Sequence, residues 1–376
     1  MARAIFLSVL VLTLCLLIEG IAFGQVIFTS NSQPVNVYLL PYLQNWKLDS
    51  QNESQSINQF SFPLFINIRP TNNLKFWIVD SVSSSSLDKN GKKIDLSGIS
   101  DTKVKASYSI FDQRLLLTVG ANLPIGKEQL VQSKLELANL LYNKVLGFRV
   151  NKLGVGLDVN AGMALAMDFG PYGVSVSTSY LRRGSYISAK DSKSDYKPGD
   201  EIIVVTAFDM ISDKTIFNGD FAYTHYGSDE IDSTKNFKEG DELRGKILVN
   251  FRFDPVILGL SLTDTIRMKN QIISANNSLT AEESNSHGNR LDASLIAQYL
   301  ITRQLSVSPL TGLTFVADNG YGNGGAFVWN AGGSIQFAPN RNTSFSLNAK
   351  YLKGNMESGN IDVSGYEVGS VIVIKF

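Results

Sequence analysis

Residue types that carry chemistry are scarce in this chain of 376 residues, which has two histidines and one cysteine. His225 falls on the outward side of a predicted strand, and His287 lies in a predicted loop beside Gly288. The sequence places no nucleophile and acid next to either histidine, as a hydrolytic site would require. A serine–histidine or aspartate–histidine hydrolase is conceivable, but the pattern favours a protein that is not an enzyme and that uses no cofactor and no metal.

Two further signals argue against nucleotide or nucleic-acid binding. Gly320 to Gly325 (GYGNGG) matches a glycine-rich phosphate motif by its letters, but it leads into a strand pattern and not into a helix. The chain has 34 basic and 34 acidic residues, which gives a formal net charge of zero. Such a balance predicts no nucleic-acid partner.

The first 24 residues have the pattern of a secretory signal peptide. Arg3 precedes an apolar run over residues 5–18, and Ala22 and Gly24 supply small residues for cleavage after Gly24. The run is shorter than the roughly 20 residues of a transmembrane helix. Cys15 lies inside the run, so cleavage would leave a mature chain without disulfides, thiol catalysis or cysteine–zinc sites.

Strands must position the polar residues in the rest of the chain. From Leu153 to Phe169 apolar residues alternate with small or polar ones, and the alternation resumes after Gly170-Pro171. A period of two over this length indicates β-strands joined by a short turn. A second face that is small as well as polar favours the inside of a barrel.

Short turns and long polar loops alternate along residues 25–376, which we interpret as one all-β domain. This arrangement is typical of a transmembrane antiparallel up-and-down β-barrel of the bacterial outer membrane. Short turns are expected near residues 112–113, 170–171, 212–214, 254–255, 302–303 and 339–342, and long loops at 81–102, 124–152, 188–199, 227–240, 270–288, 318–325 and 354–362.

The N-terminal part of the domain decides the number of strands. Alternation over residues 60–68 and 74–78 predicts two strands, and residues 35–46 supply one more. Together with the later hairpins these make about sixteen strands. Pro41 marks the first strand as bent or bulged. If residues 35–46 instead form a plug, about fourteen strands remain.

The C-terminal residues 363–376 place apolar residues on one face of a strand and charged residues on the other. A last strand that ends on an aromatic residue resembles the assembly signal of outer-membrane barrels, although Ser370 departs from its apolar spacing. The barrel assembly machinery is therefore an expected partner. The candidate signal residues are Tyr366, Val368, Ile372, Ile374 and Phe376.

Counting by alternation collects charged and polar residues of both signs on the inner face. The simpler interpretation is a solvated wall whose opposite charges pair across strands. The alternative is a transverse field or a solute-binding constriction. The lumen-lining candidates are Lys103, Lys105, Asp158, Asn160, Arg183, Asp209, Asp220, Glu242, Arg244, Lys246, Arg252, Arg267, Arg290, Asp292 and Lys350.

Residues 127–146 break the period of two and predict one amphipathic helix in an extracellular loop. The helix either packs over the rim of the barrel or forms a hydrophobic lid that captures an apolar solute. The candidate residues on its apolar face are Leu130, Leu137, Leu140, Leu141 and Val145.

Residues 96–127 resemble a hairpin of the outer-membrane barrel family named for the meta-pathway of phenol degradation. A more distant resemblance is to the fatty-acid outer-membrane channel superfamily. Both imply an outer-membrane transporter. The residues that carry the resemblance are Gly98 and Asp101 at the entry to the hairpin, and Leu123, Pro124 and Gly126 at its exit.

The expected function is a porin-like channel or transporter for small solutes, with hydrophobic solutes as one option, in the Gram-negative cell envelope. The alternative is a non-conducting structural or surface-binding barrel that acts through its extracellular loops. Expected partners are outer-membrane lipid, lipopolysaccharide and a small-molecule solute. The sequence does not define the solute, the gating, the oligomeric state, or whether the lumen is open or plugged.

Overall fold

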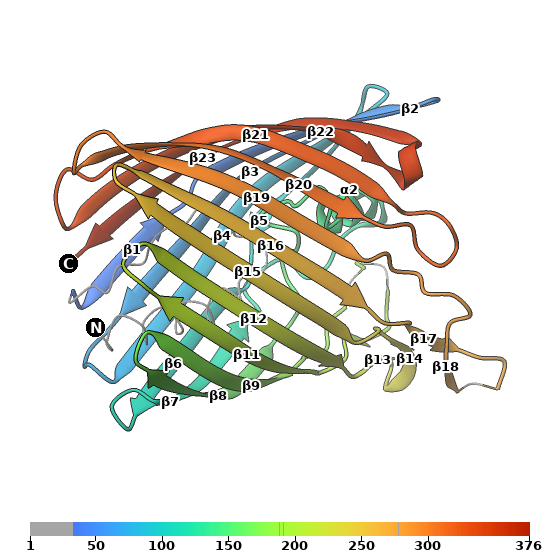
Figure 1. Cartoon of the computed structure of the whole chain (residues 1–376). Coiled ribbons are helices and arrows are strands. Elements are labelled where there is room, and N and C mark those ends of the chain that lie inside the picture. The colour runs from blue at the N-terminus through green and yellow to red at the C-terminus, as the bar shows by residue number, and fades with distance from the viewer. Residues whose placement is uncertain (1–32, 188, 191, 277) are drawn as a thin grey trace.

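The computed structural model describes residues 33–187, 189–190, 192–276 and 278–376, which form a closed antiparallel β-barrel (Figure 1). The last strand, β23 (Ile361–Lys375), pairs with β1 (Val35–Leu39) and β2 (Tyr42–Ser50), and this pairing closes the barrel. The predicted signal peptide, residues 1–24, lies outside the described residues.

Eighteen paired segments make sixteen barrel strands, because β1 and β2 form one interrupted strand and β5 and β6 form another. The predicted count of sixteen is therefore confirmed. The other segments of the wall are β3 (Ser54–Ile68), β4 (Leu74–Lys89), β5 (Lys92–Ile99), β6 (Thr102–Ile110), β7 (Leu115–Leu123), β8 (Asp158–Phe169), β9 (Tyr172–Arg182), β11 (Glu201–Ile211), β12 (Thr215–Tyr226), β15 (Glu242–Phe253), β16 (Val256–Arg267), β19 (Arg290–Leu300), β20 (Leu305–Val316), β21 (Ala326–Phe337) and β22 (Thr343–Met356).

Pro41 interrupts the first strand without shifting the register in which that strand pairs with β3. Leu39 pairs with Leu64, and Tyr42 pairs with Ser61, so the same number of residues separates the two pairs on each strand. A bulge would add a residue on one side. The strand therefore has no bulge here, and the register does not test the predicted bend; proline removes one backbone donor from the ladder.

Residues 81–102, predicted to be a long loop, instead form the upper part of a tall hairpin. β4 continues to Lys89, Asn90 and Gly91 make the turn with positive φ angles of 52° and 80°, and β5 returns along β4. Two consecutive positive φ angles are typical of a tight hairpin turn. The alternation of apolar and polar residues that marks a strand is weak here, because serines occupy both faces of this serine-rich sequence.

β8 begins at Asp158 and not at Leu153, as the alternation predicted. Gly156 has a φ of +85°, which takes the chain out of the extended conformation just before the strand. Leu153 is buried among apolar residues inside the barrel and does not face outward. The first residues of the alternating stretch therefore belong to the preceding loop.

The two faces of the wall differ in exposure as a membrane-spanning barrel requires. On β8, Val159 is 44% exposed, while its neighbour Asp158 is 3% exposed. The outer face carries exposed apolar residues, whereas polar residues such as Asn122 and Asp220 lie on the inner face. An apolar outer band with a polar interior fits lipid on one side and water on the other.

The long loops lie at one end of the barrel and carry a second, five-stranded sheet that extends beyond β15 and β16 (Figure 1). Within the described residues, no helix is both long enough and apolar enough to cross a bilayer. The loop elements are α2 (Gln132–Tyr142), β10 (Tyr196–Lys197), β13 (Ser228–Ile231), β14 (Thr234–Lys238), β17 (Gln271–Ile273), β18 (Leu279–Ala281) and the 3-10 turn η1 (Glu357–Gly359).

Candidate functional site: an off-centre lumen

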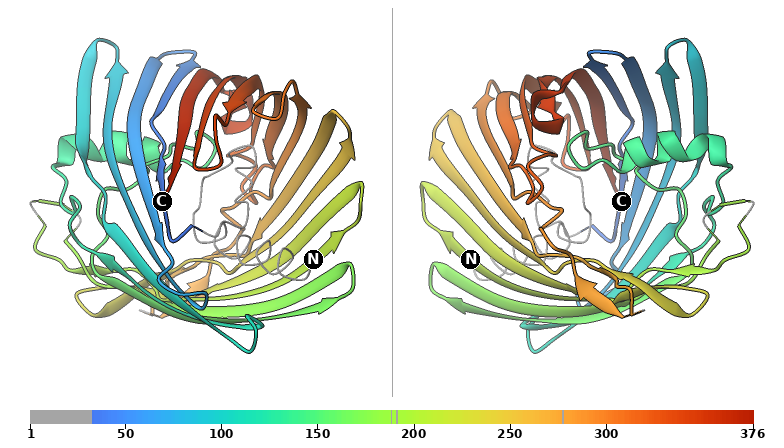
Figure 2. Two further views of the ribbon diagram at one scale, coloured as in Figure 1. Left: turned by 90° about the vertical axis from the view of Figure 1, so that its left-hand side faces the viewer. Right: turned by 90° about the vertical axis from the view of Figure 1, so that its right-hand side faces the viewer.

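The loop between β7 and β8 packs on the inner face of the barrel wall. Its helix α2 lies beside the tall β4–β5 hairpin (Figure 2). Leu137 and Leu141 of α2 are buried at 0% and 4% exposure, in a cluster that includes Trp46 and Ile57 of the inner wall. The apolar face of the helix is therefore covered by the wall.

The helix is shorter than the predicted residues 127–146, since it spans only Gln132–Tyr142. Leu130 and Val145 consequently lie outside it, before and after the helical residues, and Leu140 lies within it. All three are partly buried against the same apolar cluster. The five residues predicted for one helical face therefore meet in one apolar cluster, although two of them lie outside the helix.

Residues 144–150, which we call the crossing segment, connect distant parts of the inner wall. On β2, the Gln44 Nε2 donates a hydrogen bond to the Gly147 carbonyl at 3.0 Å. Towards the other side, Arg290 of β19 donates to the Lys144 carbonyl at 2.8 Å, and the Lys144 Nζ lies 3.9 Å from the Glu242 carboxylate on β15. The segment thus links the apolar cluster, to which its Leu146, Phe148 and Val150 belong, with the polar residues of β15 and β19.

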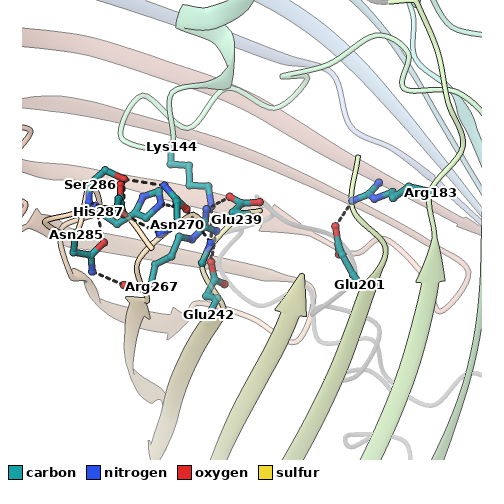
Figure 3. Close-up of polar contacts among 12 residues, drawn as sticks. Lys144, Arg183, Glu201, Glu239, Glu242, Arg267, Asn270, Asn285, Ser286 and His287 are labelled. Carbon is teal, nitrogen blue, oxygen red and sulfur yellow. Dashed lines mark hydrogen bonds and ion pairs between the residues drawn. The ribbon is translucent and has the colours of Figure 1, made fainter. Parts of the chain in front are cut away.

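The polar part of the interior contains two arginines, each held by two carboxylates near the loop end of the strands. Figure 3 shows Arg267 with Glu239 and Glu242, and Arg183 with Glu201. Arg183 pairs with Asp158 at 2.9 Å and also with Glu201. Arg267 pairs with Glu239 and Glu242, and its guanidinium lies 5.7 Å from the ring centre of Tyr226. We call Asp158, Arg183, Glu201, Glu239, Glu242 and Arg267 the charged belt.

The charged belt is acidic overall, because four carboxylates outnumber two guanidiniums. Arg267 and Glu242 have side chains only 11% and 10% exposed, so their attraction is weakly screened and the arginine charge is neutralised locally. Lys144 adds one cation, and its side chain is 48% exposed. The belt and Lys144 together carry one net negative charge.

The register places the predicted lumen-lining residues on the inner face, and several of them pair there. Asp220 lies directly opposite Lys246, and Asp209 accepts a hydrogen bond from Asn218. Lys350 pairs at 2.7 Å with Glu367. The others are distributed along the inner wall: Lys103 and Lys105 on β6, Asn160 on β8, Arg244 and Arg252 on β15, and Arg290 beside Asp292 on β19.

Lys144, Glu239 and Glu367 are among the charged residues of the described interior that sequence reasoning did not identify as lumen-lining. Lys144 was placed in the predicted helix, and Glu239 in a polar loop, where no periodicity indicates a direction. Glu367 lies on the charged face of the C-terminal strand, where alternation could have identified it. Its inner-face neighbours across the strands are Lys350, Gln44, Gln59 and Ser85. Alternation along one strand could not have identified this row, since its members come from four other strands.

The two histidines make separate loop contacts. His225 Nδ1 lies 3.0 Å from the Asp241 carboxylate on the outer side of the wall. His287 Nε2 lies 3.0 Å from the Asn270 Oδ1, which also accepts from the Gly240 backbone. Among the described residues, no three histidine, cysteine or acidic side chains gather as metal ligands would.

His287 is expected to titrate below the ordinary histidine value of about 6.5. Burial lowers its pKa first, and the cations Arg267 and Lys144 lower it further, while Glu282 and Glu242 act in the opposite direction. The folded loop therefore prefers neutral His287. Its contribution to the free energy of unfolding is complete above about pH 6.5 and decreases as the pH drops below that value.

The measurement is an NMR titration of the imidazoles in the refolded barrel, where only two histidines need to be assigned. Lys144→Met should raise the pKa of His287 by removing a nearby cation. Lys235→Met, in the outer loop sheet, serves as the control and should leave it unchanged. A pKa at or above 6.5 in the unaltered protein would show that this loop is open to water.

The closed wall, its apolar outer band and its polar interior determine where the protein resides. The chain is an outer-membrane barrel. Comparison of the sequence with protein-family models and with curated proteins gives no match. The likeness to the phenol-degradation and fatty-acid families therefore stays a resemblance of one hairpin.

Solved structures similar to the barrel include several outer-membrane proteins. Pseudomonas aeruginosa OccK7 is 10% identical, with 91% of this chain and 99% of that chain covered and a TM-score of 0.46. Salmonella typhi OmpF, in complex with daunomycin, is 13% identical, with 92% and 98% covered and a TM-score of 0.46. The COG4313 outer membrane channel from Pseudomonas putida F1 is 11% identical, with 94% and 100% covered and a TM-score of 0.40. We infer neither a family nor a solute from likenesses of this size.

Proposed function

We propose that the barrel is a channel for small polar solutes, with a preference for cations over anions. The observation that carries this proposal is the separation of the inner wall into an apolar part and a charged part, which the crossing segment links. On one side, α2 and the apolar cluster fill the space against the wall. On the other side, the charged belt and the polar faces of β8 to β19 line the remaining lumen.

A route for hydrophobic solutes has less support from the same residues. Leu137 and Leu141, the central apolar residues of α2, are covered by the barrel wall. A lid that captures apolar solutes would need to present such residues to the lumen or to the outside. The alternative of a non-conducting surface barrel rests on the sheet of long loops and is an outcome of the test below.

Conductance in planar lipid bilayers under a salt gradient tests the channel and its charge preference together. The unaltered barrel should conduct, with potassium preferred over chloride. Glu239→Gln combined with Glu242→Gln should shift the reversal potential towards anions, because Arg267 then keeps its charge without a partner.

The matched control is Asp49→Asn combined with Asp362→Asn. These two residues are direct cross-strand neighbours on the outer face, so their loss changes the same number of charges away from the lumen. If both pairs of substitutions shift the reversal potential equally, the belt does not set selectivity. Absence of any conductance would favour the non-conducting barrel.

A further inference from the structure

Two glutamines connect the crossing segment to the barrel wall. Gln44 of β2 and Gln59 of β3 are direct cross-strand partners on the inner face, and both have 0% exposure. Gln44 also pairs across the strands with Glu367, and Gln59 with Ser85. Hydrogen bonds follow this row, from Gln59 to Ser85 at 3.0 Å and from Gln44 to Glu367 at 3.0 Å.

Each glutamine binds the backbone of the crossing segment through both ends of its amide. The Gln44 Oε1 accepts from the Arg149 N–H at 2.8 Å, while its Nε2 donates to the Gly147 carbonyl. The Gln59 Oε1 accepts from the Val150 N–H at 3.0 Å, and its Nε2 donates to the Val150 carbonyl at 2.7 Å.

These contacts supply hydrogen-bond partners to the backbone of the crossing segment. Its residues 147–150 belong to no strand or helix, and Val150 is buried at 6% exposure. Buried backbone donors and acceptors need partners. A carboxamide offers one donor group and one acceptor at a fixed spacing, so it can pair with an extended backbone as a neighbouring strand would.

Arg149 adds a further contact on the same side. Its Nη2 donates to the Tyr42 hydroxyl at 3.3 Å, and its guanidinium lies 4.4 Å from the centre of the Tyr42 ring. Tyr42 in turn donates to Glu367. The segment is therefore attached by side chains of the wall, while Lys144 extends from its other end towards Glu242.

We propose that Gln44 and Gln59 are positioning residues that hold the crossing segment against the wall and so fix the width of the lumen and the location of Lys144. This proposal rests on the proposed channel function for its effect on conductance, but the attachment itself is independent of transport. Without the two amides, the Gly147 and Val150 carbonyls and the Arg149 and Val150 N–H groups lose these partners, and the segment is held less firmly against the wall.

The test compares the unaltered barrel with Gln44→Met combined with Gln59→Met, which keeps the side-chain length and removes the hydrogen bonds. Hydrogen exchange of the peptide that contains residues 147–150 should become at least about tenfold faster, since the Arg149 and Val150 N–H groups lose their acceptors. Single-channel conductance should increase or become noisier. The apparent melting temperature of the barrel reports whether the wall itself is intact.

The control is Gln298→Met combined with Gln336→Met. These glutamines lie on the inner parity of β19 and β21, and Gln298 bonds to Ser306 of the wall. The control should alter neither exchange of the segment nor conductance. Unchanged exchange in the Gln44 and Gln59 variant would overturn the attachment, and faster exchange with unchanged conductance would overturn its role in the lumen. An unaltered barrel that does not conduct would overturn the channel function, while exchange would still decide the attachment.

Discussion

Leu260→Lys is expected to destabilise the barrel by about 2 to 4 kcal/mol, because it places a charge on the lipid face near the bilayer midplane. Leu260 is 46% exposed on the outer face in the middle of β16, with Val249 and Leu295 as its cross-strand neighbours. The measurement is the free energy of unfolding from urea titration of the barrel refolded in lipid vesicles.

Ser261→Lys is the matched control one position along the same strand. Ser261 faces the interior, where its cross-strand neighbours are Leu248 and Ser294. Lysine can extend into the lumen from this position, so the free energy of unfolding should change little. Equal losses for the two variants would show that the inner and outer faces of β16 have been exchanged.

Glu367→Ala is expected to lower the free energy of unfolding by about 3 to 5 kcal/mol, the usual cost of removing one partner from a buried ion pair. Glu367 has a side chain 5% exposed and lies 2.7 Å from the Lys350 Nζ. It also accepts from the Tyr42 hydroxyl and the Gln44 amide. The substitution leaves an ammonium and two polar groups without this acceptor.

Lys47→Ala provides the comparison in the same urea titration. Lys47 pairs with Asp49 on the outer face, where the two side chains are 56% and 41% exposed. An exposed pair of this kind contributes about 0 to 1 kcal/mol. If Glu367→Ala cost no more than Lys47→Ala, water would have to reach the row of Glu367, Gln44 and Gln59.

Local pattern predicted the wall of the barrel well. Val159 and Asp158 separate onto outer and inner faces because side chains of a strand alternate and because lipid and water lie on opposite sides. The same rule gives the inner placement of Arg183 and Arg267. It failed at residues 81–102, where serines on both faces remove the contrast between the two sides.

The interior was decided by tertiary structure. The apolar stripe of α2 indicates from the sequence alone that Leu137 and Leu141 pack against other apolar residues. It does not indicate that Trp46 and Ile57 are among those residues. Gln59 meets Val150 across 91 residues of sequence. A period of two orders neighbours along one strand, whereas such contacts depend on which strands become adjacent when the barrel closes. The sequence therefore determined a wall with two faces, and only closure of that wall decided where the loop would cross the interior.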